Sequence, residues 1–202
     1  MKHYIIKKKG ETLNWSEMPA LQMDVLYRQT QQDVCAFAQI GYTEDALLLH
    51  MWISVPSIRA AEYGPLGRPC KDSCLEFFFQ PVVGDPRYIN LEFNFNGCFY
   101  LGVGTCIQDL IRLLPEGDAM EIFQPDIRLT EAGWEIFYQI PYSFIRRIFP
   151  NFAAEPGNTI RANCFACSDL SEPRYHMSWS PVVAEPFTFH TSNCFGCMRF
   201  EN

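Results

Sequence analysis

The chain has 202 residues, of which 48% are hydrophobic and 19% charged, a composition typical of a globular protein with a buried core. A net charge of −7 repels nucleic-acid phosphates, so we expect no nucleic-acid partner. The sequence as written shows no signal peptide and no apolar run of membrane-spanning length. We therefore expect a soluble cytoplasmic protein with no membrane partner, or an extracellular one if a signal has been removed.

Strand-like segments follow one another along the chain, in keeping with an aromatic content of 15%. Tight turns are predicted at Thr43-Glu44 and at Asn96-Gly97. One short helix is expected near 141–149, since Pro141 suits a first helical turn and Phe144 and Ile148 are spaced i,i+4. The expected strands cover residues 4–9, 34–42, 45–55, 73–81, 87–95, 98–104, 133–141, 159–169 and 196–200. This pattern predicts one all-β domain over 1–202, an antiparallel β-sandwich with jelly-roll or immunoglobulin-like layers.

Nine cysteines include two C-x-x-C pairs, Cys164 with Cys167 and Cys194 with Cys197, which together have the spacing of a zinc site. A zinc knuckle needs a tight turn, whereas "CFAC" has no Gly or Pro and lies in a strand-like run, where residues three apart point to opposite faces. Cys70 and Cys74 would be about 13 Å apart if both lay in a strand. We therefore expect free thiols acting as small apolar residues, and no zinc at the four C-x-x-C positions.

Polar residues alternate with apolar ones in two neighbouring segments, "LEFFFQ" and "INLEFNFNG". If these strands pair, Glu76, Glu92 and Asn94 converge on one surface. Carboxylates and amides together donate and accept hydrogen bonds, as sugar hydroxyls require. The alternative is an ordinary water-exposed sheet face, and alternation alone does not separate the two.

A sugar site also needs an aromatic platform. Trp179, in the polar context "HMSWSP", is the best placed, with His176 beside it as a ligand contact. Trp52 shares a strand face with His50, and Tyr63 lies in a Gly- and Pro-rich loop.

Five blocks in this order resemble the family-9-like carbohydrate-binding modules, which belong to a wider DOMON-like β-sandwich group. The blocks are "KDSCLEFFFQP", "YINLEFNFNG", "WEIFYQIPYSFI", "IRANCFACSD…YHMSWSP" and "PFTFHTSNCFGCMRF". The resemblance covers about residues 13–200. It implies a non-catalytic sandwich that holds a mono- or oligosaccharide between two tryptophans, with structural calcium in some members.

On that resemblance, Glu76 matches the acidic sugar contact, Asn94 the amide contact and Trp179 one jaw of the aromatic clamp. Glu92 falls where sugar-binding members tend to carry Arg. The second jaw is absent, because the chain has Pro69-Cys70 there, and Tyr63 could substitute for it. Asp72 and Asp85 are the acidic residues available for calcium, and no cofactor is required.

Other functions compete with sugar binding. A glycoside hydrolase would need the Glu76 and Glu92 carboxyls about 5–5.5 Å apart. Haem binding is disfavoured because His50 and Met51 are adjacent in a strand and point opposite ways. Another alternative is a β-sandwich that has lost its sugar site and serves protein–protein contacts. The absence of the second aromatic jaw favours this alternative. The oligomeric state is left open.

Overall fold

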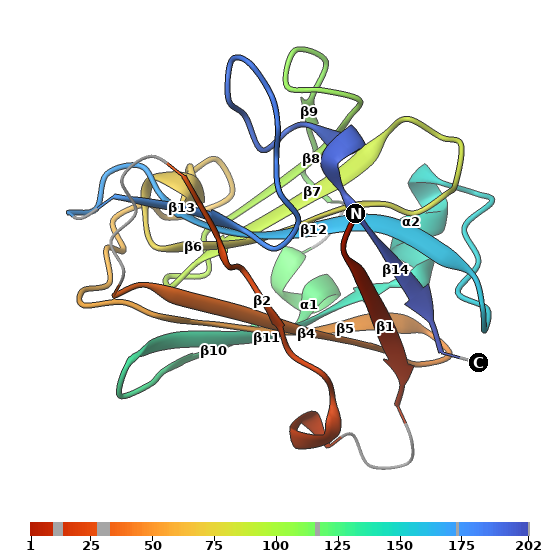
Figure 1. Cartoon of the computed structure of the whole chain (residues 1–202), viewed down its shortest axis with the longest axis horizontal. Helices are drawn as coiled ribbons and strands as arrows, with labels where there is room; N and C mark the ends of the chain where they lie inside the picture. The colour runs from red at the N-terminus through yellow and green to blue at the C-terminus, as the bar shows by residue number, and fades with distance from the viewer. Residues whose placement is uncertain (10–13, 28–32, 116–117, 173, 202) are drawn as a thin grey trace.

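Two layers of β-strands face each other across the core, as the computed structural model shows (Figure 1). The structure describes residues 1–9, 14–27, 33–115, 118–172 and 174–201. We call the layers sheet 1 and sheet 2. Sheet 1 has the order β14 (Gly196–Phe200), β12 (Thr159–Ser168), β6 (Cys74–Gln80), β7 (Tyr88–Asn94), β8 (Phe99–Gly104) and β9 (Ile111–Arg112). In addition, β13 (Tyr175–Ser178) pairs with β12, and β3 (Val25–Tyr27) pairs with β13.

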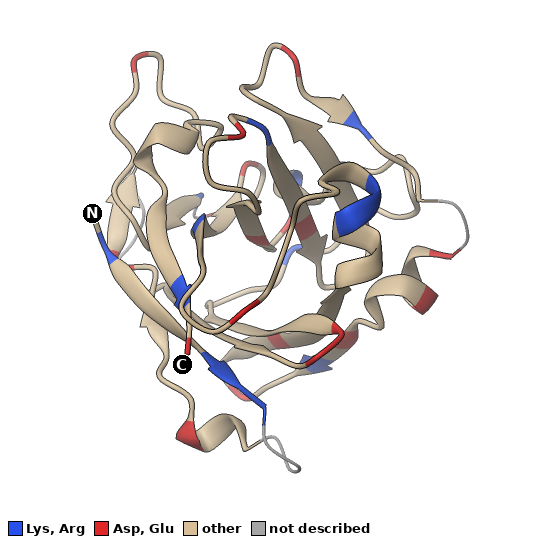
Figure 2. Ribbon diagram, turned by 90° about the vertical axis from the view of Figure 1, so that its right-hand side faces the viewer, with Lys and Arg blue, Asp and Glu red and all other residues tan. Residues whose placement is uncertain are grey.

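Sheet 2 is the second layer, and its strands also pair antiparallel with one another. Its order is β10 (Asp126–Leu129), β11 (Gly133–Pro141), β5 (Ala46–Ser54) and β4 (Cys35–Tyr42), with β2 (Leu21–Gln22) on β4. Figure 2 shows the layers from the side, with most acidic and basic residues at the periphery. Single-turn 3-10 helices lie outside the layers: η1 (Trp15–Glu17), η2 (Pro69–Lys71) and η3 (Ser192–Cys194).

The core lies between the layers and is built by strict alternation along the strands. Leu75, Phe77 and Phe79 of β6 point into it, and Phe93 of β7 meets Tyr138 of β11 with ring centroids 5.1 Å apart. Since side chains alternate along a strand, Glu76 and its polar neighbours necessarily point out of the other face of sheet 1.

One strand, β1 (His3–Lys8), joins the two layers. Its first half pairs with β14, and Lys7 and Lys8 pair with β4. Both pairings are parallel, so the expectation of a wholly antiparallel sandwich is wrong at this seam. Parallel pairing between the two ends of the chain leaves no local sequence signal, because no turn connects the strands.

Two α-helices accompany the strands in the described part of the chain. The predicted helix is confirmed as α2 (Tyr142–Ile148). The sequence prediction missed α1 (Ala119–Phe123), whose N-terminus is capped by the Asp118 side chain and whose Phe123 ring is buried in the core. Neither helix is long and apolar enough to cross a membrane.

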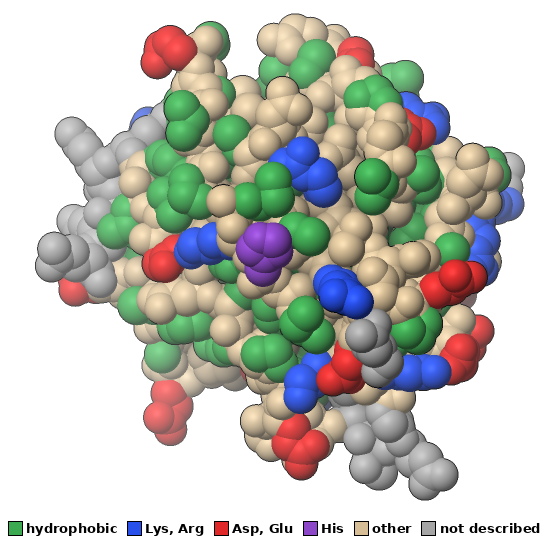
Figure 3. All heavy atoms as spheres, turned by 45° about the vertical axis from the view of Figure 1, so that its right-hand side comes forward, with side chains coloured by type: hydrophobic (Ala, Val, Ile, Leu, Met, Phe, Trp, Pro, Cys, Tyr) green, Lys and Arg blue, Asp and Glu red, His purple; other side chains and the backbone are tan. Residues whose placement is uncertain are grey.

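The all-β sandwich and the main strands are confirmed, and their predicted bounds fall within a residue or so of the observed ones. "YHMS", expected in a loop, is strand β13. On the face shown in Figure 3, acidic and basic side chains are interspersed among hydrophobic ones, and neither sign forms a continuous patch in the described part of that face.

Candidate functional site

A row of four side chains crosses the outer face of sheet 1. The strand register pairs Tyr100 of β8 with Glu92 of β7, Glu92 with Glu76 of β6, and Glu76 with Phe165 of β12. Directly opposite residues on neighbouring strands point to the same face, so two carboxylates stand side by side between two aromatic rings. We call Glu76 and Glu92 the carboxylate pair. The predicted convergence of these two residues on one face is confirmed.

This outer face is not an ordinary water-exposed surface. Along the strand direction, the η2 turn packs against β6, β7 and β12 on one side of the row. On the other side, residues 181–195 help to form a small second core over Phe78 and Phe165. Glu76 is only 2% exposed and Glu92 only 6%. Buried carboxylates are costly unless something compensates them, so the pair calls for a ligand or another functional explanation.

Glu76 is the more deeply buried member of the carboxylate pair. Its Oε1 accepts a hydrogen bond from the Cys167 thiol at 2.9 Å. Burial, and secondly the charge of Glu92, raise the pKa of Glu76 well above its ordinary value. A raised pKa favours the protonated form of this carboxyl, which donates a hydrogen bond as well as accepting one.

Glu92 is the second member of the carboxylate pair. Burial raises its pKa to about 7, against the lowering effects of a hydrogen bond from Asn90 and the charge of Arg112. Asn90 Nδ2 donates to Glu92 Oε1 at 3.0 Å, whereas the buried Asn90 Oδ1 has no hydrogen-bond partner among the described residues. An acceptor that is buried and unsatisfied next to a carboxyl suits a ligand that brings hydroxyl donors.

Arg112 and Tyr100 close the β8 end of the row. The Arg112 guanidinium lies 4.6 Å from the centre of the Tyr100 ring and donates to the carbonyl oxygens of Leu66, Gly67 and Phe99. Sequence reasoning missed Arg112, because the segment before it has no clear pattern. Asn90 and Tyr100 could have been found, since both alternate in phase with Glu92.

Aromatic rings and a histidine close the β12 end. Phe189 stacks on Phe165 with centroids 4.2 Å apart and interplanar angle 21°, and His176 lies 5.9 Å from Phe189. His176 of β13 is paired in register with Cys167 of β12, and its Nε2 lies 2.9 Å from Asp169 Oδ1. The structure thus brings His176 to the same face as the carboxylate pair. Phe189 and Asp169 had no sequence signal.

Asn94 shares this face but has a different role. Its Nδ2 donates to Asp72 Oδ2 at 2.8 Å and to the Glu62 carbonyl, and its Oδ1 accepts from the backbone N–H of Asn96 and Cys98. All of these are protein partners, so the side chain ties the loop before β6 to the β7–β8 turn. A direct sugar contact by Asn94 would have to replace them.

The two aspartates considered for calcium also have protein partners. Asp72 accepts hydrogen bonds from Arg59, from the backbone N–H of Ala61 and Glu62, and from Asn94. Asp85 forms an ion pair with Arg87, with Oδ2 and the guanidinium nitrogen 2.6 Å apart. Calcium at these positions stays a prediction.

Trp179 lies away from the carboxylate pair, contrary to its expected placement beside Glu76. It follows β13 on the core-facing side, is 4% exposed, and packs edge-on against Tyr4 with centroids 6.5 Å apart. Its one open side contributes to a surface pocket of about 380 Å³ lined by Lys2, His3 and Asp24 among others. The polar residues around Trp179 suggested a loop-like binding site. In the structure alternate residues of β13 face the core, and Trp179 continues this alternation.

Of the other two aromatic candidates, Trp52 is also separate from the row. Trp52 stands on the outer face of sheet 2 with both ring faces occupied, by Phe37 at 5.3 Å and by His50 at 4.7 Å. Tyr63 is 69% exposed in the loop before β6. His50 points outward and Met51 into the core, as expected from their adjacency in a strand.

The C-x-x-C motifs do not assemble one site. Cys164 belongs to the core and Cys167 to the outer face, as expected for residues three apart in a strand. Cys194 ends η3, where its Sγ accepts a hydrogen bond from Val183 N at 3.3 Å. Cys70 lies in the η2 turn and not in a strand, so the condition for the 13 Å separation from Cys74 is not met. Its carbonyl oxygen is 3.7 Å from Cys167 Sγ.

Comparison with known proteins places this architecture. The profile of carbohydrate-binding family 9 matches residues 7–200. A crystal structure of a candidate carbohydrate-binding protein from Bacteroides uniformis ATCC 8492 is similar, with 25% identity, TM-score 0.84 and 99% coverage of both chains. No curated protein matches the chain.

Two solved structures of a family-9 carbohydrate-binding module from Caldicellulosiruptor kristjanssonii share the fold. The one solved with glucose has 12% identity and TM-score 0.71, covering 99% of this chain and 96% of that one. The one solved with cellotriose has 11% identity and TM-score 0.70, covering 99% and 94%. With a family profile matched over almost its whole length, the chain belongs to carbohydrate-binding family 9.

Proposed function

We propose that this protein binds a saccharide without catalysis on the outer face of sheet 1, over the carboxylate pair. The observation that carries the proposal is the row Tyr100–Glu92–Glu76–Phe165, in which two buried carboxyls stand between aromatic rings. A sugar hydroxyl can donate to Glu92 and to the unpartnered Asn90 Oδ1, and can accept from protonated Glu76.

Stacking against the sugar ring is assigned to Tyr100 and to Phe189. Tyr100 is half-buried and held from one side by Arg112, and Phe189 is half-buried over Phe165. Glucose and short glucose oligomers are the first ligands to test, because two structural neighbours were solved with glucose and with cellotriose.

A glycosidase mechanism fits the row poorly. Its two carboxyls must act on the scissile bond from different sides, one on the leaving oxygen and one on the ring. Glu76 and Glu92 are direct neighbours on one sheet face and approach any ligand from the same side.

The test is calorimetric titration with glucose, cellobiose and cellotriose. Glu76→Met keeps the chain length and removes both oxygens, and we expect it to weaken binding at least about tenfold, the value of one hydrogen bond to a polar ligand group. Glu135→Met is the matched control, since Glu135 pairs with His50 on sheet 2. We expect it to bind like the unmodified protein.

The aromatic assignment has its own pair of variants. Tyr100→Ala is expected to weaken binding, whereas Tyr63→Ala, in the exposed loop, is expected to leave it unchanged. Equal binding by Glu76→Met and Glu135→Met, or no heat with any saccharide from the folded protein, would contradict the proposal. A large tryptophan emission change that Trp179→Phe abolishes would place binding at the Trp179 pocket instead.

A further inference from the structure

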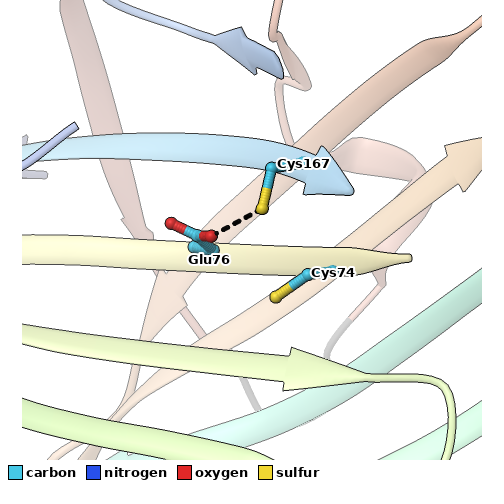
Figure 4. A group of neighbouring side chains, drawn as sticks. All are labelled: Cys74, Glu76 and Cys167. Atoms are coloured by element: carbon cyan, nitrogen blue, oxygen red, sulfur yellow. Dashed lines mark hydrogen bonds between the residues drawn. The ribbon is translucent and has the colours of Figure 1, made fainter. Parts of the chain in front are cut away.

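Cys74, Glu76 and Cys167 point toward one another on the outer face of sheet 1 (Figure 4). Cys74 of β6 and Cys167 of β12 are paired in register, and Glu76 lies two residues beyond Cys74 on the same strand and face. One ligand atom from each residue lies within 4.8 Å of the other two, and all three residues are buried. Neither C-x-x-C motif of the sequence supplies such a group.

Among the residues that the structure describes, Glu76 has no cationic partner to balance its charge when it is ionised. Cys167 is the hydrogen-bond donor to the Glu76 carboxylate, and no Lys or Arg forms an ion pair with it in the described part of the chain. The second carboxyl, Glu92, stands directly beside it. A cation would offset both the burial and the repulsion, which a thiol hydrogen bond does only weakly.

We propose that Cys74, Cys167 and Glu76 bind a zinc ion. Two sulfur donors and one carboxylate form a mixed set that suits Zn²⁺, whereas Ca²⁺ and Mg²⁺ take oxygen ligands. Tetrahedral zinc with Zn–S near 2.3 Å places its two sulfurs ~3.8 Å apart, within the span of the observed group. The fourth position is left to water or to Cys70, whose carbonyl already contacts Cys167.

Zinc takes the place of protons in this group. The ion displaces the thiol protons of Cys74 and Cys167, and the proton of Glu76 where that is present, and these protons leave to solvent. The Cys167 Sγ–Glu76 Oε1 separation, 2.9 Å with the proton between, opens as the metal enters. Burial raises the pKa of the Cys74 thiol, and a hydrogen bond with Cys74, followed by burial, raises the pKa of Cys167. Zinc must displace the protons that these thiols hold, so its affinity rises with pH.

This zinc site goes beyond the proposed saccharide binding and does not rest on it. The two share only Glu76, and the metal can be tested with no sugar present. Failure of zinc binding leaves the calorimetric result with saccharides intact, and a protein that binds no saccharide can still bind zinc.

The experiment uses the full chain, reduced and stripped of metal by a chelator, with all nine thiols verified in denaturant. Cobalt(II) is added as the spectroscopic probe, and zinc is then titrated against a chromophoric chelator. We expect thiolate-to-cobalt charge-transfer bands, one zinc per chain, and an affinity that increases between pH 6.5 and 8.

Variants locate the ion. Cys167→Ser and Cys74→Ser should each remove the charge-transfer intensity of one sulfur and weaken zinc binding by more than the roughly 10–100-fold cost of an outer-shell change. Cys164→Ala, three residues away on the core side of β12, should bind zinc normally. Glu76→Gln, which conserves shape, provides a second test if a cysteine variant unfolds.

Two results overturn the proposal. One is the absence of stoichiometric zinc binding by the reduced, folded protein. The other is zinc binding that survives Cys167→Ser but is lost in Cys194→Ser, which would assign the metal to the closing C-x-x-C motif.

Discussion

A carboxylic acid in a sheet interior is an expensive residue, and this chain has two in contact. Glu76 and Glu92 pair across β6 and β7 and are almost wholly buried. Replacement by apolar residues would relieve the desolvation of both, so their presence is best explained by what they bind. The free energy of unfolding should therefore depend on pH in the range where these two carboxyl groups titrate.

Glu92→Gln tests this pH dependence. The pKa of Glu92 is raised from 4.5 to about 7 in the folded protein, so its stabilising contribution is complete below pH 4.5 and is lost as pH rises through 7. Gln does not titrate but still accepts from Asn90. The variant should therefore gain stability relative to the unmodified protein between pH 4 and pH 8, by up to about 3 kcal/mol.

Urea unfolding at both pH values measures the difference. Glu131→Gln, in the exposed turn between β10 and β11, is the control and should follow the unmodified protein at each pH. A Glu92→Gln curve parallel to that of the unmodified protein from pH 4 to pH 8 would show that Glu92 titrates normally.

At the level of the strands, Gly196 allows β14 to pack closely against the ring of Trp179, which follows β13. Gly196 lies at the start of β14, where a Cβ atom would come within 2.4 Å of the Trp179 ring and 3.0 Å of the Lys2 carbonyl oxygen. Close packing against Trp179 therefore explains the glycine in "CFGC".

Gly196→Ala should destabilise the protein by about 3 kcal/mol, because a core ring must move. Gly84→Ala is the matched control: Gly84 has φ +89° but nothing within 4 Å of its added Cβ, so we expect only about 1 kcal/mol of backbone strain. Thermal unfolding gives the cost, and a shifted tryptophan emission in Gly196→Ala alone reports the displaced ring. Equal costs would contradict this account.

Much of each strand could be predicted from sequence because alternation is local. The faces of β6 and β7 followed from "LEFFFQ" and "INLEFNF", and with them the placement of Glu76 beside Glu92. What covers those faces could not be predicted. Trp179 was expected beside Glu76 because of the polar residues next to it, which belong to the opposite face of β13. The face of Asn94 was predicted, but its hydrogen bond to Asp72 was not, because the two residues are 22 positions apart.

The candidate site shows the same limit. Cys74 and Cys167 meet through strand register, and Arg112 reaches Tyr100 from a two-residue strand. Each contact joins segments that are distant in sequence or too short to have a period. The spacing of residues within a sequence motif therefore predicts neither the Cys74–Cys167 contact nor the Arg112–Tyr100 contact.

For the whole molecule, β1 is the element that makes two layers into one fold. It is hydrogen-bonded to β14 on one side and to β4 on the other. The side chain of Ile6, in the middle of β1, is fully buried. Loss of packing at this strand should weaken both layers together.

Ile6→Ala should cost about 2–5 kcal/mol, the usual range for deleting a buried aliphatic side chain. Ile5→Ala is the control, since the neighbouring Ile5 is 45% exposed and faces outward. Denaturant unfolding gives the difference. Hydrogen exchange should show β4 and β14 losing protection to the same extent, and weakening of only one layer would contradict a joining role for β1.

The seam at β1 also sets an order of events during synthesis. Among the described strands β1 is synthesised before all others and β14 after all others, so β1 waits for one of its two partners until residues 196–200 have been made. Contacts of such long sequence separation are slow to form, and an unpaired strand edge invites pairing with other chains. Chains truncated before residue 196 should therefore aggregate rather than persist as a smaller folded unit, and folding of the complete chain should be slow for its size.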